Sequence, residues 1–167
     1  MNDMFIKIGA IKGESKDQQH PDEIEVLSWA WGESQAAGPG GSGPGGGPGS
    51  GGGAGKVSMQ DFTFTHVLDV ASPELMKACA AGTHLSEATF SARRSAPGQP
   101  DFLTVRLTDV TVSAVSTGGS HDDAAGFLET VALRFAKIRV EYRRQQSSGG
   151  LAAPSTFGWD LHANKGI

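Results

Sequence analysis

Residues 57–94 constrain the fold more than any other part of the chain, because strand and helix patterns alternate within them. Residues 57–68 are rich in β-branched and aromatic side chains, which predicts a strand. The sequence Ser72-Pro73-Glu74 is typical of a helix start, and Gly82 of a helix end. Residues 85–94 return to a period of two, which predicts a second strand.

The helix predicted at about residues 72–82 needs a partner, because a helix of about ten residues is marginal alone in water. Ser72 is expected to cap the first turn by accepting a hydrogen bond from a free backbone amide. Leu75, Met76 and Cys79 share one face at helical spacing. We expect this stripe to pack on a sheet, with the single cysteine acting as a small buried hydrophobe.

The N-terminal third predicts two strands joined by a polar loop. Residues 4–9 alternate as a short strand, residues 12–21 form the polar loop, and residues 23–33 alternate as a second strand. The large apolar residues of the second strand share one face and are predicted to point into the core: Leu27, Trp29 and Trp31.

Two long strands are predicted after the helix, over residues 101–116 and 127–142. We expect them to pair antiparallel through a turn near Asp122 and Asp123. In each strand the apolar residues occupy every second position, and this pattern shifts by one residue once, near Asp109 in the first strand and near Ala136 in the second. The pairing brings these two positions opposite each other. Matched changes of this kind indicate a bulge or bend where a hairpin passes from one sheet to another. A short closing strand is predicted around Trp159.

The predicted architecture is therefore one mainly β domain over residues 1–167, with about seven strands. We expect a small antiparallel β-barrel or tight sandwich with one helix packed against it. Residues 36–55 contain 12 glycines and 3 prolines in 20 residues. This composition predicts a flexible surface loop joining two strands, since it offers too little burial to offset its ordering entropy.

Composition disfavours several classes of partner. The formal charge of −4 and the pI of about 5.7 argue against nucleic acid. No apolar run approaches the ~20 residues that span a membrane, and no charged leader precedes an apolar run at the N-terminus. We therefore expect no membrane insertion and no cleaved signal peptide.

The motifs offer no chemistry, and the sequence predicts neither catalysis nor a metal or other cofactor. The run Ser120-His121-Asp122 has the letters of a catalytic triad, but adjacent residues cannot place nucleophile, base and orienter in line. Residues 50–57 approach a phosphate-binding loop, and residues 41–46 a dinucleotide fingerprint, yet neither match opens a helix. His66 is expected to be a partly buried, hydrogen-bonded residue.

Seven stretches resemble the hemolysin-coregulated protein (Hcp) family, the tube subunit of the type VI secretion system. They occur in the family's order and span nearly the whole chain, and they are MFIKI at 4–8, IKGESKD at 11–17, IEVLSWAWG at 24–32, GKV at 55–57, QDFTFT at 60–65, SAVSTGGS at 113–120 and GWDL at 158–161. The Lys-Gly-Glu-Ser loop followed by the paired-tryptophan strand is the most specific part. The long, low-complexity Gly/Pro tract departs from the family's shorter glycine-rich loop.

The resemblance implies a β-barrel flanked by a helix that assembles into hexameric rings. It further implies that the rings stack into a tube inside a contractile sheath, with a spike at the tip, and hold effector proteins in the lumen. Such a protein is located in the bacterial cytoplasm before secretion and is then expelled to the extracellular space or a target cell. Two other classes stay open from the residues alone: a monomeric β-barrel that binds a small ligand, and an unrecognised hydrolase.

Two groups of residues are candidates for contact. Ser28 and Ala30 lie on the strand face opposite the tryptophans, where a solvated strand would normally carry Lys, Glu or Thr. Small residues indicate close approach of something else. A neighbouring subunit and cargo in the lumen are equal alternatives from the residues, and the resemblance favours the lumen.

The second group lies in the polar loop, whose match to the family is good. We expect this loop to contact a neighbouring subunit or ring, with a solvated loop as the alternative. The residues concerned are Lys12, Glu14, Ser15, Lys16 and Asp17.

Overall fold

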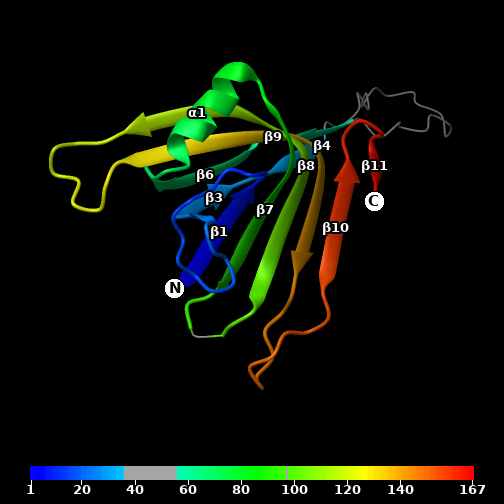
Figure 1. Cartoon of the computed structure of the whole chain (residues 1–167). Coiled ribbons are helices and arrows are strands. Elements are labelled where there is room, and N and C mark those ends of the chain that lie inside the picture. The colour runs from blue at the N-terminus through cyan, green and yellow to red at the C-terminus, as the bar shows by residue number, and fades with distance from the viewer. Residues whose placement is uncertain (36–55, 97) are drawn as a thin grey trace, which may run out of the picture.

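The computed structural model of the chain describes residues 1–35, 56–96 and 98–167. The loop predicted at residues 36–55 lies outside these ranges, so its predicted flexibility stays a prediction. The described residues form strands and one helix, arranged as an antiparallel β structure with the helix at one end (Figure 1).

The elements follow the predicted order. They are β1 (Asn2–Ile8), β2 (Ile24–Glu25), β3 (Ser28–Ala30), β4 (Glu33–Gln35), β5 (Val57–Met59), β6 (Phe62–Val67), α1 (Ser72–Ala81), β7 (His84–Arg94), β8 (Asp101–Gly118), β9 (Leu128–Tyr142), β10 (Ser155–Asp160) and β11 (Lys165–Gly166). The strand predicted at residues 23–33 is three short strands, β2 to β4, and the one predicted at 57–68 is two, β5 and β6. The other predicted strands each correspond to one observed strand.

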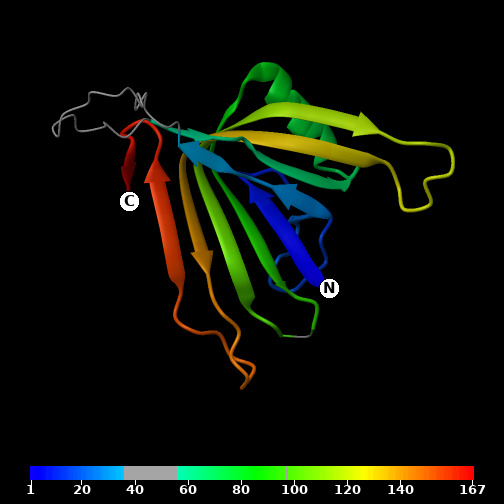
Figure 2. The same ribbon diagram turned by 180° about the vertical axis from the view of Figure 1, so that it is seen from behind.

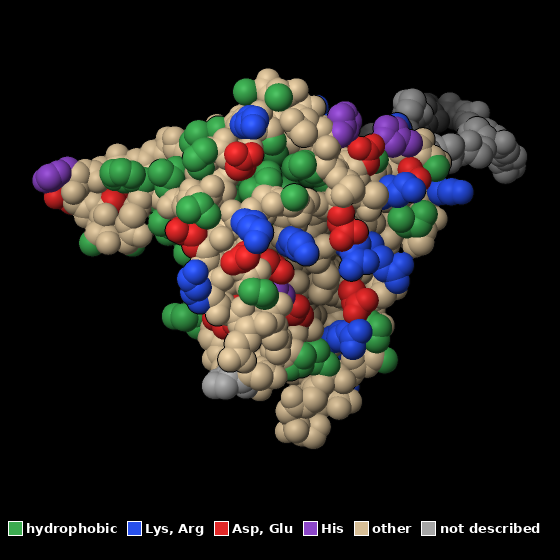
Figure 3. All heavy atoms as spheres, in the orientation of Figure 1, with side chains coloured by type: hydrophobic (Ala, Val, Ile, Leu, Met, Phe, Trp, Pro, Cys, Tyr) green, Lys and Arg blue, Asp and Glu red, His purple; other side chains and the backbone are tan. Residues whose placement is uncertain are grey.

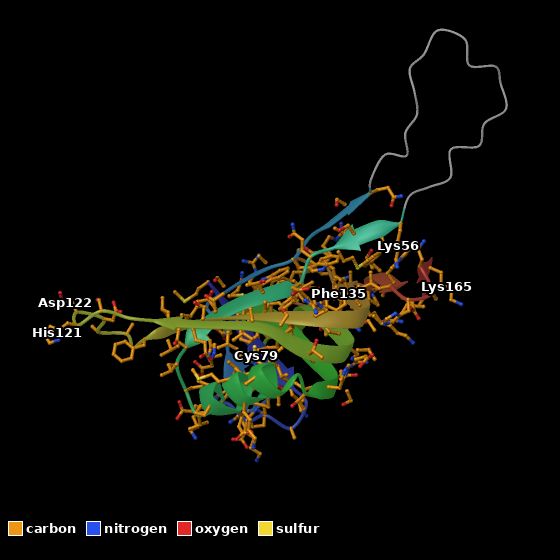
Figure 4. All side chains as sticks on the ribbon, turned by 90° about the horizontal axis from the view of Figure 1, so that it is seen from above. Lys56, Cys79, His121, Asp122, Phe135 and Lys165 are labelled. Atoms are coloured by element: carbon orange, nitrogen blue, oxygen red, sulfur yellow. The ribbon has the colours of Figure 1, made fainter. Side chains whose placement is uncertain are left out.

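One large sheet has the order β11-β10-β9-β8-β7-β1-β2, and every pairing in it is antiparallel. β6 also pairs with β9, and β3 pairs with β6. The sheet therefore curls round from β2 to β3 without closing into a complete barrel (Figures 1 and 2). β4 and β5 form a separate hairpin that projects from the body (Figure 4).

The long hairpin β8–β9 bends where the sequence predicts. Val105 and Leu107 are buried before the bend, and Val110 and Val112 after it, so the parity changes at Asp109. The pairs on either side of Asp109 place it opposite Ala136. Its φ of 55° turns the backbone at this point. A second irregularity, a register shift between Val112 and Ala114, was not predicted.

The helix α1 matches the predicted bounds, and Gly82 ends it in the left-handed region with φ 61°. The predicted N-cap is wrong. Ala71 occupies the cap position without a side-chain hydrogen bond, and Ser72 Oγ accepts instead from the backbone N–H of Asp69. Asp69 in turn accepts from the N–H of Ala71. The turn before the helix, rather than its first turn, is thus held by side chains.

The buried face of α1 also differs from the predicted stripe. Leu75 and Ala78 are buried, whereas Met76 is 40% exposed and Cys79 is partly buried against the core. The helix packs against β8, with Leu75 and Ala78 buried and Met76 on the exposed side.

The prediction that Leu27 points into the core is wrong. The backbone N–H of Val26 donates to the carbonyl of Met4 on β1, while the N–H of Leu27 donates to the carbonyl of Thr65 on β6. The chain therefore changes partner strand between these two residues, and the alternation breaks. Val26 is buried, and Leu27 is 53% exposed.

The two tryptophans follow the predicted direction but are not fully covered. Trp29 stacks on Phe62 at 5.6 Å and packs against Phe90 at 5.0 Å between ring centroids, yet it stays 37% exposed beside the open edge of the sheet. Trp31 is partly buried and lies 6.3 Å from the ring of Phe157.

The loop between β1 and β2 is held against the barrel by His20. This buried ring stacks on Phe5 at 4.5 Å, and its two nitrogens lie 3.2 Å from an Asp101 oxygen and 3.0 Å from a Glu23 oxygen. The hydrogen bonds to Asp101 and Glu23 raise the pKa of His20 from 6.5 to about 9. The imidazolium form is therefore the one that fastens the loop at neutral pH.

Truncating the buried Leu75 should destabilise the fold far more than truncating the exposed Met76 of the predicted stripe. Leu75→Ala removes a fully buried side chain, and we expect a loss of about 2–5 kcal/mol in the free energy of unfolding. Met76→Ala, on the same helix, should lower the free energy of unfolding by less than about 1 kcal/mol because that side chain is 40% exposed to solvent. Denaturant unfolding of both variants measures this, and equal losses would contradict the observed helix orientation.

The His20 contacts should make stability depend on pH. Because the folded pKa of about 9 lies above the ordinary 6.5, their contribution is complete below about pH 6.5 and is lost as pH rises through 9. The free energy of unfolding should therefore fall across this interval in the native chain and not in His20→Gln. The exposed His84→Gln is the control and should keep the native slope. If the free energy of unfolding of His20→Gln depended on pH as it does in the native chain, the role given to His20 would be refuted.

Candidate functional site

Where four strands lie side by side, one face of the sheet carries a block of small side chains. The register aligns two rows across β3, β6, β9 and β8, and we name their eight residues the small-residue face. The rows are Ser28, Thr65, Thr130 and Ser116, and next to them Ala30, Thr63, Ala132 and Ala114. Between these rows, the alternate residues of the same strands turn to the opposite face, which carries buried Phe64 and Val131. The two predicted lumen residues, Ser28 and Ala30, are thus the edge of a larger surface.

The small-residue face is neutral and shallow. It offers only hydroxyl and methyl groups, and the hydroxyls of Thr65 and Thr130 lie 3.4 Å apart across the strands. Ser28 and Ala30 are exposed and point away from the core, as predicted. A surface without long side chains lets another molecule approach the backbone closely.

The nearest charges on this side of the sheet neutralise each other. Asp61 lies 4.0 Å from Arg134 and accepts a 2.6 Å hydrogen bond from Ser113 Oγ, which also donates to the carbonyl of Ala132. Ser113 is the residue at the register shift of β8. The irregularity therefore fixes the boundary of the small-residue face.

Sequence reasoning missed six of these eight residues. The alternation Thr63-Phe64-Thr65 is visible in the chain and already places two threonines on one side. What the chain does not show is that β6 lies between β3 and β9, which is a matter of long-range pairing.

The polar loop brings its predicted residues together but commits several of them to contacts within the chain. Ser15 is buried, and its backbone bonds to Asp22 and Glu23. Lys12 forms an exposed ion pair with Asp22 at 3.1 Å. Glu14 and Lys16 are exposed.

Asp17 is the loop's main anchor. Its carboxylate forms a two-point ion pair with Arg93 of β7, one contact being 3.1 Å, and it accepts from the backbone N–H groups of Gln19 and His20. These bonds, that to Arg93 first, lower the pKa of Asp17 below its ordinary value. Contacts within the chain therefore account for the positions of Ser15 and Asp17, and the expected contact of the loop with a neighbouring subunit or ring stays a prediction.

Gly13 is needed for the same loop. A Cβ at this position would lie 2.5 Å from the carbonyl oxygen of Glu23, so the two arms of the loop touch through backbone alone.

The triad-like letters do not form a site. Ser120, His121 and Asp122 lie on the exposed tip of the β8–β9 hairpin, far from the core (Figure 4). Both nucleotide-like motifs fall wholly or mainly in residues 36–55, outside the described part of the chain. Within the described ranges, no group of three or more His, Cys, Asp and Glu side chains is arranged to hold a metal ion.

His66 is more deeply buried than predicted. It is fully buried across the strand pair from Glu129, which is also fully buried, and the ring Nε2 lies 3.0 Å from Glu129 Oε1. Asp69 lies 3.8 Å from the other ring nitrogen. A histidine–carboxylate pair thus replaces an apolar contact inside this end of the barrel.

Across the ranges that the structure covers, α1 included, there is no helix with the length and apolarity that a membrane span requires.

The chain and its fold are similar to those of known proteins. Residues 5–142 match the family described as type VI secretion system effector, Hcp. Protein hcp1 of Pseudomonas aeruginosa is 48% identical over 164 residues, which cover 97% of this chain and 96% of that protein.

Solved structures of Hcp and related secretion proteins have the same fold as this chain. Hcp1 from Salmonella typhimurium superposes with a TM-score of 0.78 at 38% identity, covering 99% of both chains. A type VI secretion system effector from Yersinia pestis gives 0.72 at 31% identity, covering 95% of this chain and 99% of the other. A further structure, of a type six secretion system protein, gives 0.89 at 27% identity over the whole of both chains. The resemblance noted in the sequence is confirmed, and the chain belongs to the Hcp family of secreted type VI secretion system proteins.

Proposed function

We propose that this chain is the subunit of a hexameric ring, and that the rings stack into the tube that a type VI secretion system expels. In this proposal the small-residue face lines the lumen and contacts effector proteins during export. The tube is surrounded by a sheath and carries a spike, and the chain serves as structure and carrier without catalysis. It waits in the bacterial cytoplasm before it is expelled.

The observation that carries the proposal is the composition of the small-residue face. A sheet face left to solvent commonly alternates polar and charged side chains with the buried ones. Here eight aligned positions hold only Ser, Thr and Ala. A channel wall of this kind leaves the widest passage and offers no fixed charge that would hold a passing protein in place.

Ring formation is consistent with the open sheet. A closed ring needs a head-to-tail contact between two different surfaces of the same chain. The curled sheet presents unlike sides, since the helix α1 lies over one end and the projecting β4–β5 hairpin lies at another (Figures 1 and 4). One side of each copy can therefore contact the other side of the next copy around a symmetry axis.

The polar loop has a proposed role as a contact to the next subunit or ring. Ser15 and Asp17 hold its shape from within, through the backbone bonds and the Arg93 pair. Lys12, Glu14 and Lys16 carry its exposed charges. The anchored loop would thus present these charges in a fixed arrangement, which lowers the entropy lost on contact.

The purified chain should have a native mass of six copies, and Ala30→Gln should keep that mass while losing cargo. The longer side chain enters the lumen without touching the core, so folding and assembly are spared. Native mass spectrometry reports the assembly, and co-purification of a co-expressed small effector protein reports the cargo.

Ala81→Gln is the matched control, because Ala81 is exposed at the end of α1 rather than on the small-residue face. It should change neither readout. A native mass of one chain at micromolar concentration would contradict the ring and favour a monomeric ligand-binding barrel. Rings of Ala30→Gln that fall apart would place this face between subunits instead.

Replacing Lys12, Glu14 and Lys16 together by alanine should slow growth of tubes from rings. The change removes the exposed charges of the loop and leaves the Asp17–Arg93 and His20 anchors in place, so the melting temperature should move by no more than a few degrees. Electron microscopy of tube length measures the effect. Tubes of native length would refute a contact role for the loop.

A further inference from the structure

Large apolar side chains are exposed together where β6 ends. Leu27 and Leu68 are 53% and 40% exposed and line the same cavity of about 170 Å³. Phe127 and Leu128 are 52% and 46% exposed. The N–H of Leu68 donates to the carbonyl of Phe127 at 2.8 Å, so these segments adjoin. We name Leu27, Leu68, Phe127 and Leu128 the β6-end patch.

Carboxylates surround the cavity beside this patch. Glu14, Glu25 and Asp69 line it together with the two leucines. Burial, with the nearby charges of Glu14 and Glu129, raises the pKa of Asp69 above its ordinary value. In the described structure none of the three lining carboxylates forms an ion pair with a lysine or arginine. Asp69 lies 3.8 Å from the His66 ring and its side chain is only 10% exposed. Glu14 and Glu25 therefore give this surface its uncompensated negative charge, at the edge of an apolar centre.

A second, independent feature lies on the outer face of β8 and β9, in the part of the hairpin where β9 also pairs with β10. Arg106 and Arg139 are directly opposite each other in the register. Like charges in this position are destabilising. Glu87 lies 3.6 Å from Arg106, whereas Arg139 has no ion pair among the described residues. Figure 3 shows Lys and Arg side chains, with Asp and Glu side chains among them, on the right of the molecule. We name Arg106 and Arg139 the arginine pair.

The two features lie on different sides of the chain. In Figure 1 the loop after β6 is on the left, and β10 with the adjoining half of β9 is on the right. A head-to-tail ring places different sides of consecutive copies against each other. The acidic, apolar end of one copy and the unpaired Arg139 of the next have complementary charge.

We propose that the β6-end patch and its carboxylates receive the arginine pair of the neighbouring copy, and that this is the contact that closes the ring. The inference rests on the ring formation proposed above. The arginine stems cover Leu27 and Leu68 while the guanidinium groups meet Glu14 and Glu25. An apolar centre with a charged rim is the usual anatomy of a protein interface. The opposite charges set the register of the two copies.

A charge placed in the patch should break rings, and an equally exposed position supplies the control. Leu68 and Met76 are both 40% exposed. Leu68→Asp should raise the concentration at which rings dissociate by at least about tenfold, because it buries a charge in the apolar centre. Met76→Asp, on α1, should leave that concentration unchanged. Sedimentation velocity over a dilution series measures both, and thermal unfolding of the monomer confirms that each variant folds.

A charge exchange tests the partner assignment. Glu25→Arg and Arg139→Glu should each weaken the ring about tenfold or more, and the double variant should recover most of the loss. Provided that the native chain forms rings, either of two results would overturn the inference. One is that Leu68→Asp forms rings as stable as the native ones, and the other is that the double charge variant is no more stable than the single variants. A native chain that forms no rings would instead overturn the proposed function, and this contact with it.

Discussion

The pairing of β8 with β9 is the constraint on which the rest of the structure depends. β9 borders β8 along its whole length, but its other neighbour changes from β6 to β10 at the bend. Val110 and Ile138 are both buried, so the core continues through the change of parity. The left-handed conformation of Asp109 makes this possible. Without the bend, the strands that pair with β6 and those that pair with β10 would form one flat ribbon with no enclosed core.

The same bend gives one hairpin two different outer surfaces. On one side of it, Ser116 and Thr130 belong to the small-residue face. On the other side, Arg106 and Arg139 stand opposite each other and carry charge. A neutral surface for passage and a charged surface for contact are therefore built from the same pair of strands. The proposed lumen and the proposed subunit contact are linked through the geometry of this hairpin.

Sequence reasoning recovered what depends on local pattern. The bounds of α1, the change of parity at Asp109 and the outward direction of Ser28 and Ala30 all follow from spacing within a single segment. It failed where the outcome depends on a distant partner. Leu27 is exposed because Val26 and Leu27 bond to different strands, which no alternation within residues 23–33 reveals. Likewise, Ser72 bonds back to Asp69 rather than forward into the helix, because the preceding turn competes for its hydroxyl. Most of the small-residue face was missed for the same reason, since its rows exist only once β6 lies between β3 and β9.

The central claim is that the small-residue face lines the channel of a ring. Electron cryomicroscopy of the assembled rings tests it most directly, because the position of β3 and β6 relative to the symmetry axis can be read from the density. The account predicts six subunits with Ala30 and Thr65 facing the axis and no neighbouring chain covering them. A ring in which these residues lie beneath an adjacent subunit, or on the outer surface, would contradict it.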